Sequence, residues 1–324
     1  MKILLPIINF ILALILVFIL VYPEIQAKKV VEAQVLYTKN MGALPFLVAQ
    51  EKGYFDSLRI KISAEEVVKG GEEVEMVGRG SKNAAFGTLW DLFAFKAAIR
   101  PEAYKIFYQV KSSVDNPQTA LITLKKKRIR TLKDLKTKRK IGYYKDSKIK
   151  QIIKYILSEM GIDPEIHSYI PLSLKEMQTA LEENIVDVLV AVEPVRSELL
   201  KKNGIKIVDD GFIEKHVFSP YLYSTGFTSI VNVNLNRKAI KRLVLATEMA
   251  IDFIRKHPDK TVEIIRKSFG IEDTTVYVNI PSFEKYSEID PAEIRRLQDK
   301  LRDMQVLLRE ADYTGSLMKR EDLR

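Results

Sequence analysis

The groups best suited to contact a ligand are mostly aromatic and neutral polar side chains placed where predicted strands end. In the N-terminal third they are the side chains of Tyr37, Thr38, Thr88 and Trp90 and the backbone amides around Gly42 and Leu44. Farther along the chain they are Gln118, Thr119, Ser147, Glu193, Tyr223 and Thr225. Open α/β sheets hold ligands beyond the carboxyl ends of their strands, so these side chains are predicted to line one ligand site.

The segment MGALPFLVAQEKGYF, residues 41–55, illustrates how such a site is built after the first strand. Pro45 is tolerated at the start of a helix and Gly53 suits its C-terminal cap, so a short helix is predicted between them. Its first-turn amides, from Gly42 to Leu44, then point toward the ligand site and could hold an anion. The alternatives are a generic surface helix and, for Tyr37, an aromatic side chain packed at the end of a strand.

Each of the other candidates also has a structural alternative. Trp90 could stack on a planar ligand or pack in the core, and the Gln118 amide and Thr119 hydroxyl could bond a ligand or belong to a polar loop. Ser147 is either a donor in the cleft or a helix N-cap. Glu193 could accept a hydrogen bond from a ligand amine or hold a hinge.

The C-terminal candidates are Tyr223 and Thr225, which could close the site or pack within a sheet. Taken together, the candidate side chains include one acid and no arginine clamp. This favours a monoanion held by amides, or a flat heterocycle stacked on aromatic rings, over a clamped dianion.

The pattern of nucleophiles and metal ligands argues against an enzyme. His167, His216 and His257 are scattered, and the chain contains no cysteine. No P-loop, nucleophile elbow or GxGxxG motif is present. We therefore expect neither catalysis nor a cofactor or metal.

The N-terminus predicts export. Residues 3–22 carry no charge, and Ala27 stands where a signal peptidase could cut, so residues 1–27 are a signal peptide or a retained anchor, with cleavage preferred. The missing cysteines exclude disulfides and a lipoprotein-type anchor. The expected location is the periplasm or the extracellular face of the cytoplasmic membrane.

The chain has 52 basic and 42 acidic residues, a net charge of +10, and its positive excess is concentrated in residues 124–142. Contact with nucleic acid or anionic lipid is one interpretation of this segment. Apolar residues at regular positions, Ile129, Leu132, Leu135 and Ile141, instead favour a solvated helix and strand edge. No nucleic-acid partner is expected.

Predicted strands and helices alternate along the chain, which indicates an α/β protein with mostly parallel sheets. The length of 324 residues allows two lobes. We expect residues 28–122 and 221–324 to form lobe 1, and residues 123–220 to form lobe 2, with a ligand cleft between them. A last helix is predicted from Pro291, with Asp290 as its N-cap and Glu293 at the capping-box position.

Four segments together resemble a known family: LPFLVAQEKGYFD, LKDLKTKRKIGYYKDS, VDVLVAVEPV and AIDFIRKHPDKTVEII. They are similar, in this order, to periplasmic substrate-binding proteins of ABC importers in the nitrate, sulfonate, taurine and thiamine-pyrimidine group, over residues 30–323. The resemblance implies a type II periplasmic binding protein fold and, as partners, a membrane permease and an ATPase. The turn YYKDSK departs from the small residues common in this group and leaves the ligand open.

The resemblance implies a solute-binding protein, expected as a monomer, that closes its lobes on a sulfonate, a nitrate-like anion or a pyrimidine-type heterocycle. One alternative is a membrane-anchored ligand sensor or adaptor that retains the N-terminal segment. Another is an enzyme like the synthases of the thiamine pyrimidine, although the cysteine and histidine features expected of those enzymes are missing here.

Overall fold

The computed structural model of this chain describes Leu12, Leu16 and residues 29–324. The predicted signal peptide or anchor, residues 1–27, lies outside the described residues except for those two leucines. Within the described part of the chain, no helix is long and apolar enough to cross a membrane.

The described residues form two β-sheets. The first has the strand order β11-β4-β10-β3-β1-β2. Its strands are β1 (Val31–Tyr37), β2 (Ile60–Glu66), β3 (Ala84–Leu89), β4 (Tyr104–Ser112), β10 (Tyr221–Ser229) and β11 (Ser282–Lys285). The second has the order β7-β6-β8-β5-β9. Its strands are β5 (Thr119–Leu124), β6 (Lys140–Tyr144), β7 (Ser168–Leu172), β8 (Val188–Val192) and β9 (Ile205–Asp210).

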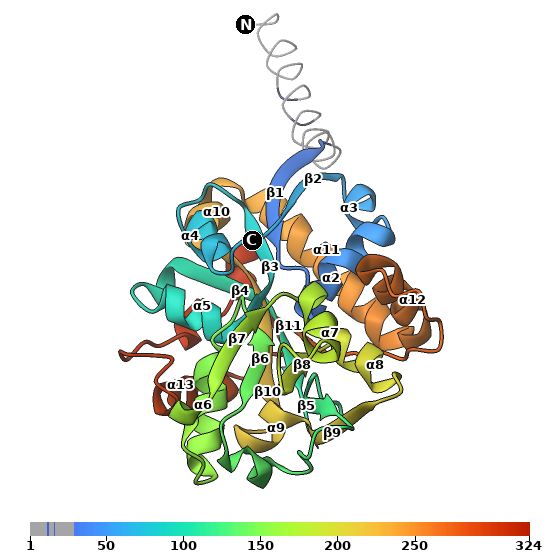
Figure 1. Cartoon of the computed structure of the whole chain (residues 1–324). Coiled ribbons are helices and arrows are strands. Elements are labelled where there is room, and N and C mark those ends of the chain that lie inside the picture. Colours follow the sequence, from blue (N-terminus) through green and yellow to red (C-terminus); the bar gives the residue numbers. More distant parts are fainter. Residues whose placement is uncertain (1–11, 13–15, 17–28) are drawn as a thin grey trace, which may run out of the picture.

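Helices pack around both sheets (Figure 1). Those that follow strands of the first sheet are α2 (Leu44–Glu51), α3 (Tyr54–Ser57), α4 (Glu72–Gly78), α5 (Trp90–Ala97), α10 (Ile230–Leu235), α11 (Arg237–Lys256), α12 (Pro258–Phe269) and α13 (Pro291–Asp303). Those that follow strands of the second sheet are α6 (Ile149–Glu159), α7 (Leu174–Glu182), α8 (Val195–Leu200) and α9 (Phe212–His216).

The two sheets are the cores of two lobes, which confirms the predicted α/β fold class. Both sheets are mixed rather than mostly parallel. The reason is that β5 and β10, the strands entered when the chain crosses between lobes, run antiparallel to their neighbours. Because β5 already belongs to the second sheet, the predicted lobe boundary at residues 122–123 falls inside a strand, and the chain crosses before Thr119.

Local sequence signals set several helix ends. Pro45 lies in the first turn of α2, and Gly53 follows this helix with φ of 67°, in the left-handed region that glycine adopts freely. Pro258 begins α12 directly after the end of α11. Asp290 caps α13 by accepting a hydrogen bond from the Ala292 amide at 2.8 Å, as predicted.

The capping-box role predicted for Glu293 is wrong. Its carboxylate lies 2.6 Å from the ammonium of Lys111 on β4, where Glu284 of β11 is a second acidic partner. The side chain therefore joins α13 to the first sheet, a tertiary ion pair that a local pattern does not reveal.

The apolar positions of the basic segment are buried, since Ile129, Leu132, Leu135 and Ile141 are each less than 9% exposed. Of its basic residues, Lys127 pairs with Asp187 at 2.8 Å. This arrangement is the one expected of a solvated element whose apolar side chains anchor it to the second lobe.

Candidate functional site

The two lobes touch along one side of the cleft between them. The Gly70 amide of lobe 1 donates to the Asp146 carboxylate of lobe 2 at 3.3 Å, and the Lys148 amide donates to Asp91 Oδ2 at 2.8 Å. The Lys148 ammonium lies 3.5 Å from the ring centroid of Phe95. These contacts join the two lobes on one side of the cleft.

The larger interlobe cavity has a volume of about 340 Å³. Its lining comes from both lobes: Thr38, Lys39, Glu66, Val67, Val68 and Phe269 on one side, and Tyr144, Lys145, Asp146, Ser173, Leu174 and Lys175 on the other. Most of these residues lie just beyond the ends of β1, β2, β6 and β7. The carboxyl ends of parallel strands thus converge here from both sheets, as expected for a ligand site in this fold class.

A second, narrower cavity lies deeper between the lobes and has a volume of about 10 Å³, room for about one water molecule. It is lined by Leu89, Asp91, Thr119, Ile149, Ile213, Tyr221 and Tyr223. Lobe 1 contributes Leu89, Asp91 and the two tyrosines, and lobe 2 contributes Thr119, Ile149 and Ile213. This deep cavity, like the larger one, is shared between lobes.

The deep cavity contains a buried carboxylate with an open oxygen. Asp91 is 3% exposed, and while its Oδ2 accepts from Lys148, its Oδ1 has no hydrogen-bond partner. Burial raises the pKa of Asp91 to about 6, against the lowering effect of the hydrogen bond from Lys148. Near neutral pH most molecules therefore hold a charged, partly unsatisfied carboxylate at this position.

The carboxylate of Glu193 follows β8 and is fully buried, but its partners are already in place. Arg196 donates to it at 2.9 Å and the Ser197 hydroxyl at 2.8 Å. Burial raises the pKa of Glu193, although Arg196 and Ser197 oppose this shift. Arg196 also binds Asp210, so its guanidinium is engaged on two sides.

Another buried acid, Glu214 of α9, organises the start of β5. It accepts from the Thr119 hydroxyl at 2.6 Å and from the Gln118 amide at 2.9 Å. Burial raises the pKa of Glu214, and these hydrogen bonds oppose the shift. The deep end of the cleft is therefore bordered by several acids, with Arg196 already paired.

Of the side chains predicted to contact a ligand, the structure brings Thr119 and Tyr223 together in the deep cavity and places Thr38 at the larger one. Tyr37 is half-buried and stacks on Phe46 with ring centroids 5.2 Å apart. Leu44 is fully buried at the first turn of α2.

The remaining predicted residues lie inside the lobes or at their junction. Gly42 approaches Ser224 so closely that an added Cβ would stand 2.1 Å from its hydroxyl oxygen. Trp90 is 1% exposed and packs edge-on against Phe93 and Tyr313, in the core of lobe 1.

The other polar candidates are engaged with protein groups. Thr88 donates to Glu73 at 3.0 Å, and Thr225 donates to the Tyr108 carbonyl at 2.9 Å. The Gln118 side-chain amide donates to the Asn279 carbonyl at 3.0 Å. The Ser147 hydroxyl donates to the Tyr144 carbonyl at 2.6 Å and accepts from the Ile149 amide, which resembles the predicted N-cap. Their roles toward a ligand stay predictions.

Sequence reasoning missed two groups of residues that line the cavities. Asp91 follows Trp90 directly, and the rule that selected Glu193, an acid just after a buried strand, would also have selected it. Tyr144, Lys145 and Asp146 belong to the turn YYKDSK, in which the sequence departs from the family that it resembles. That departure therefore lies at the site itself.

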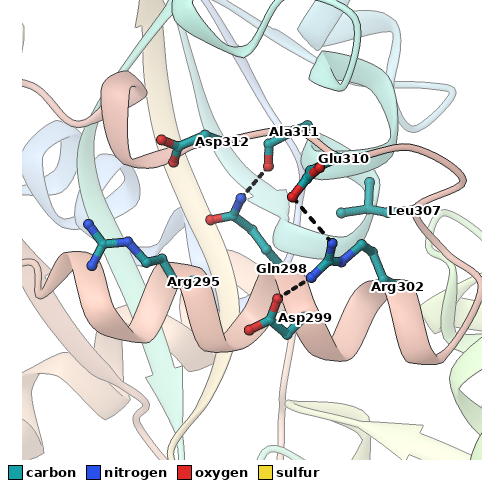
Figure 2. Close-up of a pocket in the computed structure, with 8 residues that line it drawn as sticks. All are labelled: Arg295, Gln298, Asp299, Arg302, Leu307, Glu310, Ala311 and Asp312. Carbon is teal, nitrogen blue, oxygen red and sulfur yellow. Dashed lines mark hydrogen bonds and ion pairs between the residues drawn. The ribbon is translucent and has the colours of Figure 1, made fainter.

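A third cavity, of about 310 Å³, lies away from the cleft, between α13 and the C-terminal segment (Figure 2). Several of its polar side chains are paired: Arg302 contacts Asp299 and also Glu310, and the Gln298 amide donates to the Ala311 carbonyl. The lining includes two arginines and three acids, a net charge of −1.

The histidines lie apart from each other in the structure. His216 Nε2 lies 2.6 Å from Asp209, His167 accepts from the Arg139 amide, and His257 ends α11. Among the residues that the structure describes, no group of three or more histidine and acidic side chains could hold a metal ion.

Two lobes built on mixed sheets, crossed by the chain and enclosing cavities lined from both sides, define the fold of a periplasmic binding protein. Solved structures share it. The periplasmic aliphatic sulphonate binding protein SsuA from Escherichia coli superposes with a TM-score of 0.68 at 16% identity, covering 89% of this chain and 98% of that one. The periplasmic nitrate-binding protein NrtA from Synechocystis PCC 6803 superposes with a TM-score of 0.63 at 15% identity, covering 91% and 87%.

The sequence places the chain within a family. The model of the NMT1/THI5 like family matches residues 40–261, more than half of the chain, and the protein belongs to this family. A curated relative, the 4-amino-5-hydroxymethyl-2-methylpyrimidine phosphate synthase of Legionella pneumophila, is 28% identical over 143 residues. That match spans 44% of this chain and 43% of the synthase, less than half of either protein. The family resemblance expected from the sequence is thereby confirmed.

Proposed function

We propose that this protein is an extracytoplasmic solute-binding protein that closes its two lobes on a small ligand and delivers it to an ABC importer. The observation that carries the proposal is the pair of cavities between the lobes, both lined by strand ends of both sheets. Concave sites at a lobe interface are where proteins of this architecture bind small molecules.

Location and partners follow from the sequence. The uncharged stretch at residues 3–22 supports export, and the sulphonate- and nitrate-binding proteins that share the fold are periplasmic by name. The resemblance to substrate-binding proteins supports a permease and an ATPase as partners. The protein works as a monomer in this proposal.

Hinge closure is the mechanism. The segments at residues 113–118 and 217–220 join the sheets, so a rotation there moves one lobe as a body against the other. Closure forms the contacts of Asp146 with Gly70 and of Lys148 with Asp91 and Phe95. A ligand that bridges the lobes adds to these contacts and shifts the population toward the closed form.

An engineered disulfide across the cleft tests this mechanism. An ideal Cβ on Gly70 would lie 3.0 Å from Asp146 Cβ, so the two lobes must separate by somewhat less than about 1 Å here to reach the spacing of about 3.8 Å in disulfides. The chain has no cysteine that could compete. The double variant Gly70→Cys/Asp146→Cys in the full chain should oxidise readily to a locked closed form. The two single-cysteine variants are the matched controls.

The binding measurement uses a thermal-shift panel of nitrate, methanesulfonate, taurine, benzamidine and 4-aminopyrimidine. We expect at least one compound to give a saturable shift with the reduced double variant. Oxidation before the ligand is added should block that shift, and dithiothreitol should restore it. An equal saturable shift in the oxidised and reduced forms would contradict closure around the ligand.

A second candidate is an enzyme, favoured by the similarity to a named pyrimidine phosphate synthase over part of the chain. It predicts that a bound compound is chemically changed. Mass spectrometry of the panel compound after overnight incubation with the protein separates the two functions, because a binding protein returns its ligand intact.

A further inference from the structure

The buried carboxylate of Asp91 is the strongest clue to the ligand. It stands in the first turn of α5, is 3% exposed and lines the deep cavity, and one of its two oxygens, Oδ1, has no hydrogen-bond partner. Buried polar atoms are nearly always hydrogen-bonded, because an unpaired one loses its bonds to water without replacing them. An unpartnered acceptor that persists at the interface of two lobes points to a donor supplied by the ligand.

The charges around this oxygen are negative. Tyr221 and Tyr223 line the cavity beside Asp91, and the pKa of each phenol is raised, first by burial and then by nearby carboxylates. For both tyrosines these carboxylates include Asp91 and Glu214, and for Tyr223 also Glu193.

The positive groups nearby are already engaged. Arg196 pairs with Glu193 at 2.9 Å and also with Asp210, and the Lys148 ammonium lies over the Phe95 ring. Lys148 faces Asp91 with its backbone amide, which occupies Oδ2 and leaves Oδ1 open. The charge of Lys148 also lowers the pKa of Asp91, so one cation acts on this carboxylate. A small oxyanion in the deep cavity would still face Asp91 itself and the carboxylates that raise the pKa of Tyr221 and Tyr223.

We propose that the deep end of the cleft binds the cationic N–H-donating end of the ligand, an amine, amidine or protonated aminoheterocycle, with Asp91 Oδ1 as its acceptor. Thr119 and the two tyrosines are the neutral groups that shape this end, while the larger cavity takes the rest of the molecule. This assignment rests on the proposed binding function and narrows it: nitrate and alkanesulfonates are rejected.

The two cavities are close enough to share one ligand. Tyr144 lines the larger cavity, and its phenol is among the groups that raise the pKa of Tyr223 in the deep one. The larger cavity offers Lys39, Lys145 and Lys175 together with Glu66 and Asp146, so it is not selective for one sign of charge. Because the deep cavity has a volume of about 10 Å³, the ligand enters while the lobes are apart and keeps them slightly wider than they are here.

Isothermal titration of the purified full chain in mild detergent at pH 7.5 tests the assignment. The probes are benzamidine, 4-aminopyrimidine and putrescine as N–H donors, and nitrate and methanesulfonate as oxyanions without an N–H donor. We expect saturable binding of at least one N–H donor and none of nitrate or methanesulfonate. Asp91→Asn should weaken the donor at least tenfold, because the amide offers an N–H where the ligand needs an acceptor.

The matched control is Asp56→Asn, an exposed acid in α3 that lines neither cavity, which should leave the affinity unchanged. Lowering the pH from 7.5 to 5 should weaken the wild type about tenfold, since Asp91 becomes protonated as the pH passes below its pKa of about 6. The Asp91→Asn variant should lack this part of the pH dependence.

The outcomes separate the two proposals. Saturable binding of nitrate or methanesulfonate with no response to the N–H donors overturns the assignment of Asp91 and leaves the binding function standing. Equal affinity of wild type and Asp91→Asn for an N–H donor also overturns the assignment. No binding by any probe to the folded protein overturns both.

Discussion

Replacing Asp91 by asparagine should make the protein more stable near neutral pH. The change keeps the shape of the side chain and an oxygen that can accept from the Lys148 amide, but it removes a buried charge. A carboxyl whose pKa is raised on folding binds more protons in the folded than in the unfolded state. Its contribution to stability therefore falls as the pH rises from its unfolded pKa through its folded pKa.

The size of the effect follows from the two pKa values. Against an ordinary value of 3.8, the folded value of about 6 corresponds to a total penalty of about 3 kcal/mol well above pH 6. About 1.4 kcal/mol of this develops between pH 5 and pH 8. The new amide hydrogens face the deep cavity and cost about 1–2 kcal/mol, but this cost does not depend on pH. Asp91→Asn should thus raise the free energy of unfolding by about 1–2 kcal/mol at pH 8, and by less at pH 5.

Urea unfolding of the wild type and the variant at pH 5 and pH 8 measures this directly. At each pH, the unfolding free energy of the wild type is subtracted from that of the variant. The value at pH 8 minus the value at pH 5 is the quantity to compare, because contributions that do not depend on pH cancel in it. The exposed Asp56→Asn variant should show a change near zero. A value near zero for Asp91→Asn as well would refute the reasoning, since it would mean that Asp91 does not titrate with a raised pKa in the folded protein.

Further predictions concern the packing and ion pairs around the cleft. Arg196→Met removes the partner of the buried Glu193 carboxylate and should lower the free energy of unfolding at pH 8 by about 3–5 kcal/mol; the loss should be smaller at pH 5, where Glu193 can protonate. Arg302→Met breaks an exposed pair and should cost about 0–1 kcal/mol in the same urea titration, and equal losses for the two variants would contradict the argument. Gly42→Ala places a Cβ 2.1 Å from Ser224 Oγ and should lower the melting temperature, with an unfolding cost of about 2 kcal/mol or more. Ser224→Gly in the same chain should recover part of this loss, and an unchanged melting temperature for Gly42→Ala would show that the strand can move aside.

Helix ends could be predicted from the sequence, because the signals that set them are local. Pro45, Gly53 and Asp290 each act within their own turn, and each lies where its chemistry predicted. The ordered motifs were enough to predict two lobes and the family, both of which the structure and the family match support.

Which side chains reach the cleft depends on how the two lobes pack, and no local pattern reveals it. Trp90 and Asp91 are neighbours in the sequence, yet the Trp90 ring packs in the core of lobe 1 and Asp91 lines the deep cavity. Glu293 matched a capping box, but Lys111, far away in the sequence, offers it a stronger partner. Burial, and with it the raised pKa of Asp91, arises from packing between two lobes, and no local pattern carries that information.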